Sequence, residues 1–405
     1  MTEIRPPKVA FLVTEDWYFL NHRSSLAVSL LDSGSIVTVA CNRGVFKEKI
    51  RGLGLQYYPI KFWRRSLNPF LELFTFLSII RFLLKQQPTI LHCVSIKPII
   101  YGAIASRLVG LEGVVCAVTG LGGGFAGDTK KSMVIQFLLR NLLKIALGGK
   151  RVRVLFENPD DLRFFKTLGI IQEAHAKLIL GSGVDTQEFS PIPEVAGKIA
   201  VVAATRMLWA KGIGQLVEAA RLLKKRGVDC RMLLVGDADT ENPDSISRAQ
   251  LQAWSDEGIV EWMGPKDRCD MPAILQAAHI VVLPSYYREG VPMTLIEAAS
   301  CGKPIVTTDM PGCREIVEDR VNGYLVSPRD PVELAKALEQ LIENAKLRAS
   351  MGHKGRELVL SRFSKEIVFA HTLAVYQELL SSTSYQFTGL MPPSLGSNKM
   401  DKISV

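Results

Sequence analysis

The sequence predicts an α/β fold of two doubly wound, Rossmann-like domains. In both halves of the chain, short apolar runs alternate with helical segments, a pattern typical of parallel sheets covered by helices on both faces. The length of 405 residues also fits two domains of ordinary size. Gly181-Ser182-Gly183 provides a hinge near the middle. We therefore expect one domain over residues 1–182 and a second over 183–364.

In the first half, runs of apolar residues predict buried parallel strands at 8–14, 36–41, 89–94, 113–118 and 151–157. Between them, longer segments predict helices at 23–33, 68–85, 99–109 and 131–147. The second half restarts the alternation, with strands expected at 198–205, 231–235, 279–285 and 304–308.

Helices of the second half are expected at 212–225 and 331–345, with a further one that Pro292 opens and Gly302 closes. A last helix is expected at 365–380. The tail 381–405 is rich in Ser, Pro, Gly, Asn and Lys, so we predict that it is disordered.

Charge is distributed unevenly along the chain. Residues 1–182 hold 24 Lys and Arg against 12 Asp and Glu, a balance of +12, whereas residues 183–405 hold 25 against 28, a balance of −3. A basic half favours nucleic acid, an anionic membrane or an anionic substrate as the partner. No helix-turn-helix, zinc-finger or RRM signature accompanies the charge, which argues against nucleic acid.

Other classes of protein are disfavoured by simple features of the sequence. The polar start of the chain does not resemble a secretory signal. The longest hydrophobic stretch, 69–84, is too short for a membrane span and includes Glu72 and Arg81. Seven cysteines form no C-x-x-C pair, so we expect free thiols in a reducing compartment, without a zinc site.

Two glutamates separated by seven residues carry the most chemistry. Glu289 follows the 279–285 strand, and Glu297 lies about one turn into the next helix. The N-terminus of that helix offers free N–H groups between them, which suit an anion. Upstream, Arg206 and Lys211 converge on another helix start, where they would neutralise a diphosphate leaving group. Carboxylates for sugar hydroxyls beside a phosphate site predict a nucleotide-sugar site.

This pattern resembles the E-x7-E signature of retaining GT-B-fold glycosyltransferases of family 4, the group 1 glycosyltransferases. The strings Lys303-Pro304-Ile305-Val306 and Pro311-Gly312-Cys313-Arg314-Glu315 and the R-x4-K pair also fit that family. The resemblance implies two facing domains with a shared cleft, and a last helix that crosses back to the first domain. It further implies that Glu289 is catalytic at the transferred sugar and that Glu297 holds the ribose.

The remaining donor contacts are carried over position by position. The resemblance places the base at Gly264 and the phosphates at Arg206, Lys211, Gly290, Val291, Pro292, Met293 and Thr294. Asp237-Ala238-Asp239 is similar to the metal motif of the other glycosyltransferase fold, GT-A, but lies deep in the second half. We therefore expect no metal and no cofactor besides the donor itself.

On the acceptor side, the H-x4-K-P-x-x-Y-G and T-G-L-G strings resemble a bacterial subgroup that extends lipid-linked oligosaccharides for capsule, O-antigen or protein glycosylation, generally from UDP-sugars. This implies His92 as general base or acceptor ligand and an acceptor site that includes Lys97, Thr119, Gly120 and Gly122. His22 and Arg23 open the first long helix and join this set. Val94 and Gly123 depart from the subgroup pattern, which leaves the acceptor's identity open.

The 131–147 helix and its flanks combine lysines and arginines with leucines, and Arg64 and Arg65 adjoin the apolar 69–84 segment. We expect peripheral binding to the cytoplasmic face of an anionic membrane; an alternative is that both helices merely pack on the core. Two alternative functions use the same architecture. One is a non-catalytic nucleotide-sugar-binding scaffold, and the other is an enzyme like the UDP-N-acetylglucosamine 2-epimerases.

Overall fold

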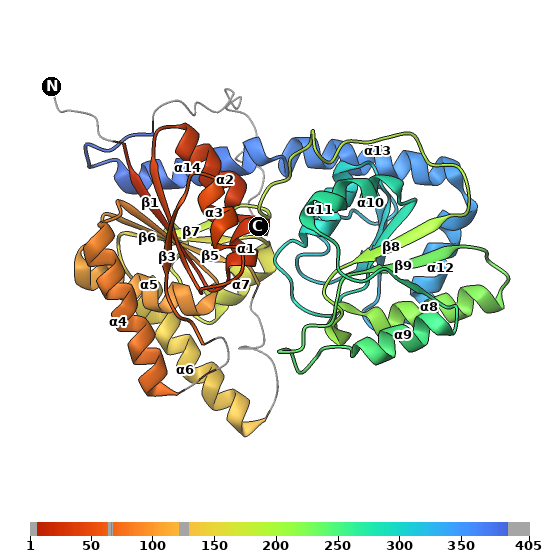
Figure 1. Ribbon diagram of the computed structural model, residues 1–405, viewed down its shortest axis with the longest axis horizontal. Coiled ribbons are helices and arrows are strands. Elements are labelled where there is room, and N and C mark those ends of the chain that lie inside the picture. Colours follow the sequence, from red (N-terminus) through yellow and green to blue (C-terminus); the bar gives the residue numbers. More distant parts are fainter. Residues whose placement is uncertain (1–5, 64–65, 67, 121–128, 388–405) are drawn as a thin grey trace.

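The computed structural model describes residues 6–63, 66, 68–120 and 129–387, which form two α/β domains (Figure 1). The sheet of the first domain is parallel, with the strand order β3-β2-β1-β4-β5-β6-β7. Its strands are β1 (Lys8–Val13), β2 (Ile36–Cys41), β3 (Gln56–Pro59), β4 (Ile90–Val94), β5 (Gly113–Val118), β6 (Val152–Phe156) and β7 (Ala176–Leu178).

Helices cover both faces of this sheet, because each helix buries one apolar stripe against it. One face packs against α4 (Pro69–Gln86), α5 (Ile96–Val109), α6 (Lys130–Leu147) and α7 (Pro159–Thr167). The other packs against α1 (Asp16–His22), α2 (Ser24–Asp32) and α3 (Lys47–Gly52). A 3-10 turn, η2 (Glu173–His175), precedes β7.

The second domain repeats the plan with a parallel sheet in the order β10-β9-β8-β11-β12-β13. Its strands are β8 (Ala200–Ala204), β9 (Arg231–Val235), β10 (Glu261–Trp262), β11 (Ile280–Leu283), β12 (Ile305–Thr308) and β13 (Gly323–Val326). The two-domain α/β prediction is thereby confirmed.

One face of the second sheet is covered by α8 (Ile213–Lys225), α9 (Arg248–Asp256) and α12 (Pro331–Glu343). The opposite face is covered by α10 (Met271–Ala277), α11 (Met293–Ser300) and α13 (Ala345–Arg362). Short 3-10 turns, η3 (Trp209–Lys211) and η4 (Arg268–Asp270), lead into α8 and α10. In the part of the chain that the structure describes, no helix has both the length and the apolar character that a membrane span needs.

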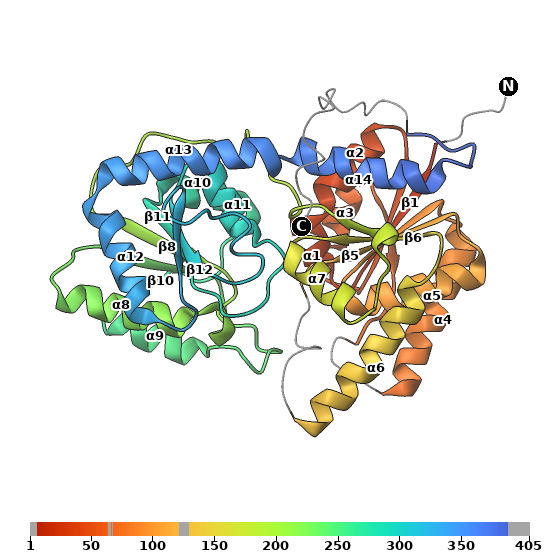
Figure 2. The same cartoon turned by 180° about the vertical axis from the view of Figure 1, so that it is seen from behind.

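The last helix, α14 (Lys365–Leu380), continues from α13 and lies over the first domain (Figures 1 and 2). Val368, Phe369 and Tyr376 bury their side chains in the core of that domain. The predicted disorder is wrong for residues 381–387, because Phe387 is buried and its ring lies 5.8 Å from that of Tyr376. Residues 388–405 lie outside the described part of the chain.

Candidate active site

The loops that follow β8 and β11 bring the predicted donor residues together. Lys211 ends the η3 turn, and Glu289 lies between β11 and α11. The Lys211 ammonium forms a short ion pair with Glu289 Oε1, which also accepts a hydrogen bond from Ser285 Oγ at 2.9 Å. Both charged side chains are nearly buried, 11% and 14% exposed. A carboxylate that accepts hydrogen bonds from both an ammonium and a hydroxyl group is held in one orientation.

Glycine is required where these two loops meet. Gly212, directly after Lys211, has a φ of +75°, and a Cβ there would lie 2.0 Å from the carbonyl oxygen of Pro284. Any other residue would therefore separate the start of α8 from the end of β11. The close approach of the two backbones is what places the Lys211 ammonium beside Glu289.

The second glutamate of the signature is buried inside α11. Glu297 is 3% exposed, and its Oε1 pairs with Arg268 Nη1 at 2.6 Å. Burial raises the pKa of Glu297, and the Arg268 guanidinium opposes that rise. Arg268 in turn lies over the ring of Phe189 at 4.8 Å. Arg268 was not among the predicted site residues. It lies only four residues after Gly264, where the base is expected, and this closeness could have indicated it.

Arg206, at the end of β8, turns toward Asp239 with an Nη1–Oδ2 distance of 3.1 Å. Asp237, the other acid of the Asp-Ala-Asp string, pairs with Arg248. Within the described residues, no group of three or more His, Cys, Asp or Glu side chains is placed to hold a metal ion. The expectation that no metal is needed stays a prediction.

The loop at residues 288–291, which we call the donor loop, meets the first domain directly. The Val291 N–H, predicted to contact phosphates, donates to Glu157 Oε2 at 3.3 Å. A Cβ on Gly290 would lie 2.1 Å from the same oxygen, so only glycine fits there. Glu157 ends β6, and burial raises the pKa of its carboxyl group while Arg23 opposes the shift.

The other predicted donor residues have mixed environments. Thr294 Oγ1 donates to the carbonyl oxygen of Ala204 at 2.9 Å, so its hydroxyl ties α11 to β8. Pro292 and Met293, which start α11, are partly exposed. Gly264 has a φ of +68° and open space on its Cβ side, which leaves room for a flat ligand against the backbone.

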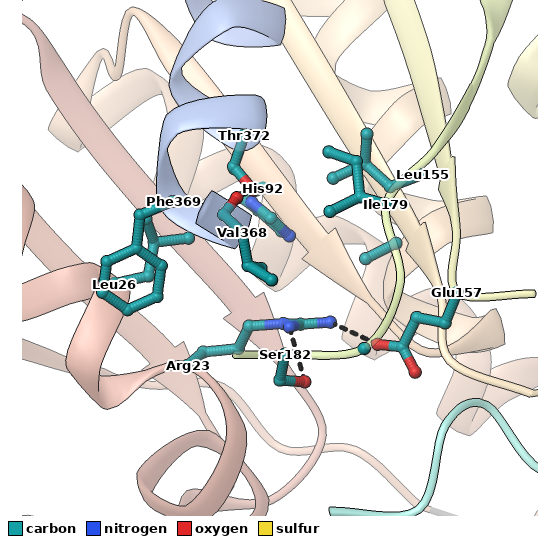
Figure 3. A pocket seen from close by; sticks show the side chains of 12 residues that line it. Arg23, Leu26, His92, Leu155, Glu157, Ile179, Ser182, Val368, Phe369 and Thr372 are labelled. Carbon is teal, nitrogen blue, oxygen red and sulfur yellow. Dashed lines mark hydrogen bonds and ion pairs between the residues drawn. The ribbon is translucent and has the colours of Figure 1, made fainter. Parts of the chain in front are cut away.

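His92 lies inside the first domain and not at the domain boundary. It is 1% exposed, its ring stacks on Phe11, and its Nδ1 lies 2.6 Å from the hydroxyl of Tyr376 on α14. Burial, followed by Arg23, lowers the pKa of His92 well below its usual value, so the ring is neutral. Its Nε2 has no partner among the described residues and lines a cavity of about 20 Å³ (Figure 3). The predicted catalytic role conflicts with this burial, which separates the ring from an acceptor.

His22 is the last residue of α1 and Arg23 lies between α1 and α2, and the two side chains face different partners. Arg23 Nη2 pairs with Glu157 Oε1 at 3.0 Å, and its Nη1 donates to Ser182 Oγ at 2.8 Å (Figure 3). The His22 ring stacks on Tyr18 at 4.3 Å. Burial, then the cations Arg23, Arg268, Lys211 and Arg206, lower the pKa of His22 to about 3. His22 is thus a neutral ring that faces the cations of the donor side.

Of the remaining predicted acceptor-side residues, one is used inside the first domain and two lie at the domain boundary. Lys97 Nζ donates to Glu72 at 2.7 Å and to two backbone carbonyls of residues 63 and 66, so its charge is used inside the first domain. Thr119 and Gly120 lie against the donor loop, where a Cβ on Gly120 would lie 3.1 Å from Gly290 N. Gly122 lies outside the described residues.

Comparison with protein families places glycosyltransferase domains in both halves. A model described as glycosyl transferases group 1 matches residues 185–358, and one described as glycosyl transferase 4-like matches residues 8–158. A relative from Campylobacter jejuni, N,N'-diacetylbacillosaminyl-diphospho-undecaprenol alpha-1,3-N-acetylgalactosaminyltransferase, is 26% identical over 93% of this chain and 100% of its own length. An Escherichia coli UDP-Gal:alpha-D-GlcNAc-diphosphoundecaprenol alpha-1,3-galactosyltransferase is 24% identical over 74% of this chain and 78% of its own.

Solved structures share the fold at lower identity. A sucrose-phosphate synthase from Thermosynechococcus elongatus superimposes with a TM-score of 0.77 at 18% identity, and covers 93% of this chain and 100% of its own. HepE from Anabaena, solved in complex with UDP, gives a TM-score of 0.72 at 20% identity over 93% and 100% of the two chains. These likenesses show the GT-B arrangement of the two domains.

Proposed function

From its membership in the two-domain glycosyltransferases, whose group 1 and 4-like models match its two halves, we propose that the protein is a retaining enzyme that moves a hexosyl or N-acetylhexosaminyl group. The donor is a nucleotide sugar, UDP-linked, and the acceptor is a lipid-linked saccharide of surface polysaccharide or glycoconjugate biosynthesis. The observation that carries this proposal is the nearly buried pair of Lys211 and Glu289 at the ends of β8 and β11.

The pair suits the chemistry of glycosyl transfer. As the bond to the diphosphate breaks, positive charge develops on the sugar and negative charge on the leaving group. The Glu289 carboxylate lies where it can stabilise the first, and the Lys211 ammonium where it can stabilise the second, aided by Arg206. Because these groups are already held in place, little reorganisation accompanies the reaction.

Donor binding exchanges partners that are already charged. In the structure, Arg206 pairs with Asp239 and Arg268 pairs with Glu297. Phosphate oxygens replace the carboxylate beside Arg206, and ribose hydroxyls bind Glu297, whose charge Arg268 balances. The two cations supply the positive charge that a metal supplies elsewhere, so we expect binding without a divalent ion. The relative from Escherichia coli is named for a UDP-linked donor, which supports uracil as the base.

A lipid-linked acceptor is supported by the relatives. Two of them, from Campylobacter jejuni and Escherichia coli, have acceptors named as diphospho-undecaprenol saccharides. Such an acceptor is held in the membrane by its lipid, so the enzyme must work at the membrane surface. His22, Thr119 and Gly120 remain the acceptor-side candidates, because they lie toward the donor cations or against the donor loop.

The surface of α4 and α6 suits that location. Apolar side chains of both helices are exposed, and both helices lie on the same face of the first sheet, on either side of α5 (Figures 1 and 2). We call this surface the apolar ridge; it consists of Phe70, Leu73, Phe74 and Leu77 on α4 and Met133, Val134, Phe137, Leu138 and Leu142 on α6. Monomeric proteins seldom expose large apolar patches without a partner, and nine exposed apolar side chains on two helices of one face favour such a partner.

Basic side chains border the apolar ridge. Arg81, Lys85 and Lys150 are exposed, and Arg140 is half-buried. Basic groups beside apolar ones favour an anionic leaflet, since phosphates attract the charges while the apolar side chains enter the acyl region. Arg64 and Arg65, which the sequence analysis included, lie outside the described residues. We therefore propose peripheral attachment at the inner face of the cell membrane.

The proposal is tested first by nucleotide binding. Calorimetry with UDP, GDP and ADP, without metal, is expected to give tight binding of UDP that Arg206→Ala weakens strongly. Transfer from UDP-sugars to lipid-linked acceptors follows, with Glu289→Ala expected to abolish it while UDP still binds. Full activity of Glu289→Ala would sink the mechanism, and absence of any nucleotide binding would favour the scaffold alternative.

A further inference from the structure

The end of β6 and the first turn of α7 contact nearly every residue of the donor loop. Asn158 Nδ2 donates to the carbonyl oxygen of Glu289 at 3.1 Å. Asp161 Oδ1 accepts from Arg288 Nη2 at 3.0 Å. With the hydrogen bond from the Val291 N–H to Glu157, the first domain holds the loop of the second at three of its four residues.

These contacts come from side chains that have no access to water. Asn158 and Asp161 are 0% exposed, and Glu157 is 6% exposed. Asn158 Oδ1 accepts from the Asp161 N–H at 2.8 Å and thereby caps α7, while its Nδ2 also contacts Asp161 Oδ2 at 3.0 Å. The two side chains are therefore fixed to each other, and a loop held by them has little freedom.

The backbone of the donor loop is confined from both domains. A Cβ on Gly312, from the second domain, would lie 1.6 Å from Gly290 O. From the first domain, Gly120 and Glu157 close the other side, at the distances given above. Figure 3 shows that Arg23 joins this arrangement to the interdomain linker, because one guanidinium binds both Glu157 and Ser182.

Glu289 is thus held from two sides. Its carboxylate is fixed by Lys211 and Ser285 of its own domain, and its carbonyl is fixed by Asn158 of the other. We propose that Asn158 and Asp161 are positioning residues, which orient the donor loop so that Glu289 faces the transferred sugar when the two domains meet. This inference rests on the proposed function and assigns to the first domain a part in the donor-side chemistry.

Loss of the contacts of Asn158 and Asp161 with the donor loop is expected to affect kcat and not nucleotide binding. Loss of these contacts lets the donor loop move, but the side chains of the second domain that bind the nucleotide sugar stay intact. Misplacement of a reacting group by about 1 Å costs up to about 10²-fold in rate. The expected signature is therefore a lower kcat with an unchanged Kd for UDP.

The test uses Asn158→Ser in the full chain. Serine caps a helix as well as asparagine does, so α7 is retained, but its side chain is too short to reach Glu289 O. We expect kcat to fall by about tenfold, the equivalent of about one hydrogen bond, with the Kd for UDP unchanged. Because two buried hydrogen bonds are lost, the melting temperature is expected to fall by a few degrees, so kcat is measured well below it. Asn344→Ser is the matched control, because Asn344 caps α13 by accepting from the Leu347 N–H at 3.0 Å; it is expected to leave kcat unchanged.

A double-mutant cycle between Arg288→Ala and Asp161→Ala gives a second readout. If the ion pair positions the loop, each variant lowers kcat and the combined variant loses no more than the worse single one, since the two groups act through one contact. Strictly additive losses would mean that the residues act separately and would overturn the pairing.

The possible results distinguish failure of the positioning role from failure of the proposed function on which it rests. Wild-type protein without UDP binding and without transfer overturns the proposed function, and this inference falls with it. An active wild type with an equally active Asn158→Ser overturns the positioning role alone. A loss of kcat in Asn158→Ser that comes with an equal loss of UDP binding would assign Asn158 to the stability of the whole site and also overturns the positioning role.

Discussion

The two halves of the site use their charged residues in opposite ways. In the second domain, Arg206, Lys211 and Arg268 pair with acids of the same domain, at the ends of strands where a ligand can replace those acids. In the first domain, Lys97 and Arg23 pair with acids of their own domain, and His92 contacts α14. One half therefore presents exchangeable charges, whereas the other uses its charges to hold the protein together.

This difference indicates how two similar sheets divide the work. In the proposed function, the second domain carries the groups that change partners during the reaction. The first domain supplies a fixed frame, and the residues that it sends across the boundary, Asn158 and Asp161, bind backbone or an arginine of the donor loop. Variants in the two halves are therefore expected to affect different measurements.

The largest expected effect is in the second domain. Lys211→Ala removes the ammonium beside Glu289 and the leaving diphosphate, so kcat is expected to fall by about 10²–10³-fold. The rate of transfer at saturating donor measures it. Lys224→Ala is the control, since Lys224 lies near the end of α8, the helix that follows Lys211, and donates to the Gly258 carbonyl at the surface. Equal activity of the two variants would contradict the division between the domains.

A second effect concerns the outer surface of the first domain. Phe137→Ser combined with Leu138→Ser removes two side chains of the apolar ridge that are 65% and 55% exposed. Each buried apolar side chain contributes about 1.5–3 kcal/mol, so binding to anionic vesicles is expected to weaken by at least about tenfold.

Sedimentation with vesicles measures this binding, and circular dichroism verifies the fold. The matched control is Val332→Ser with Leu360→Ser, because both residues are exposed on helices of the second domain. Equal binding by the two double variants would remove the apolar ridge as the membrane face.

A smaller expected effect concerns the stability of the first domain. Tyr376→Phe removes the hydroxyl that contacts His92 Nδ1 and leaves that buried nitrogen without its partner. We expect the free energy of unfolding to fall by about 1–2 kcal/mol, with kcat unchanged. Denaturant unfolding and the transfer assay measure the two quantities. If kcat fell while stability held, His92 would regain the catalytic role that its burial argues against.

The smallest effect is a pH dependence at the domain boundary. Burial, then Asp160 of the first domain, raises the pKa of Glu315 to about 7. The folded protein therefore binds this proton more tightly than the unfolded chain, so stability is lost as the pH rises from about 4.5 through about 7. Glu315→Gln cannot ionise and is expected to be more stable than wild type above that range, by about 1 kcal/mol after solvent screening.

Melting temperatures across that range test the expectation. The wild-type and variant curves should converge at the acid end and separate at the alkaline end. Asp160→Asn should reduce the separation, because it removes the charge that Glu315 faces. Parallel curves for wild type and Glu315→Gln would show that this carboxyl does not link the two domains.

Short edge elements were the part of the fold that pattern could not predict. β3, β7, β10 and β13 were not predicted, and neither were the helices α1, α3, α7, α9, α10 and α13. Edge strands are brief and only half-buried, as in the partly exposed β3 and β10, so they lack the continuous apolar run of β4 or β8. In contrast, β9 and α14 were predicted with their observed bounds. A mostly buried apolar run marks β9, and a capping serine marks the start of α14.

The sequence by itself determined the fold class and the donor side, because their information is local. Strand ends, helix starts and the spacing of Glu289 and Glu297 all lie within single strand–loop–helix units. Tertiary structure alone decided what His92, Arg23 and Lys97 do, because each finds its partner far along the chain, as His92 does 284 residues away. It also showed Arg268 and Asn158, whose contacts exist only when a loop of one element meets another. A polar residue near a strand end has the same local pattern whether it faces a ligand or a buried partner, and only packing distinguishes the two.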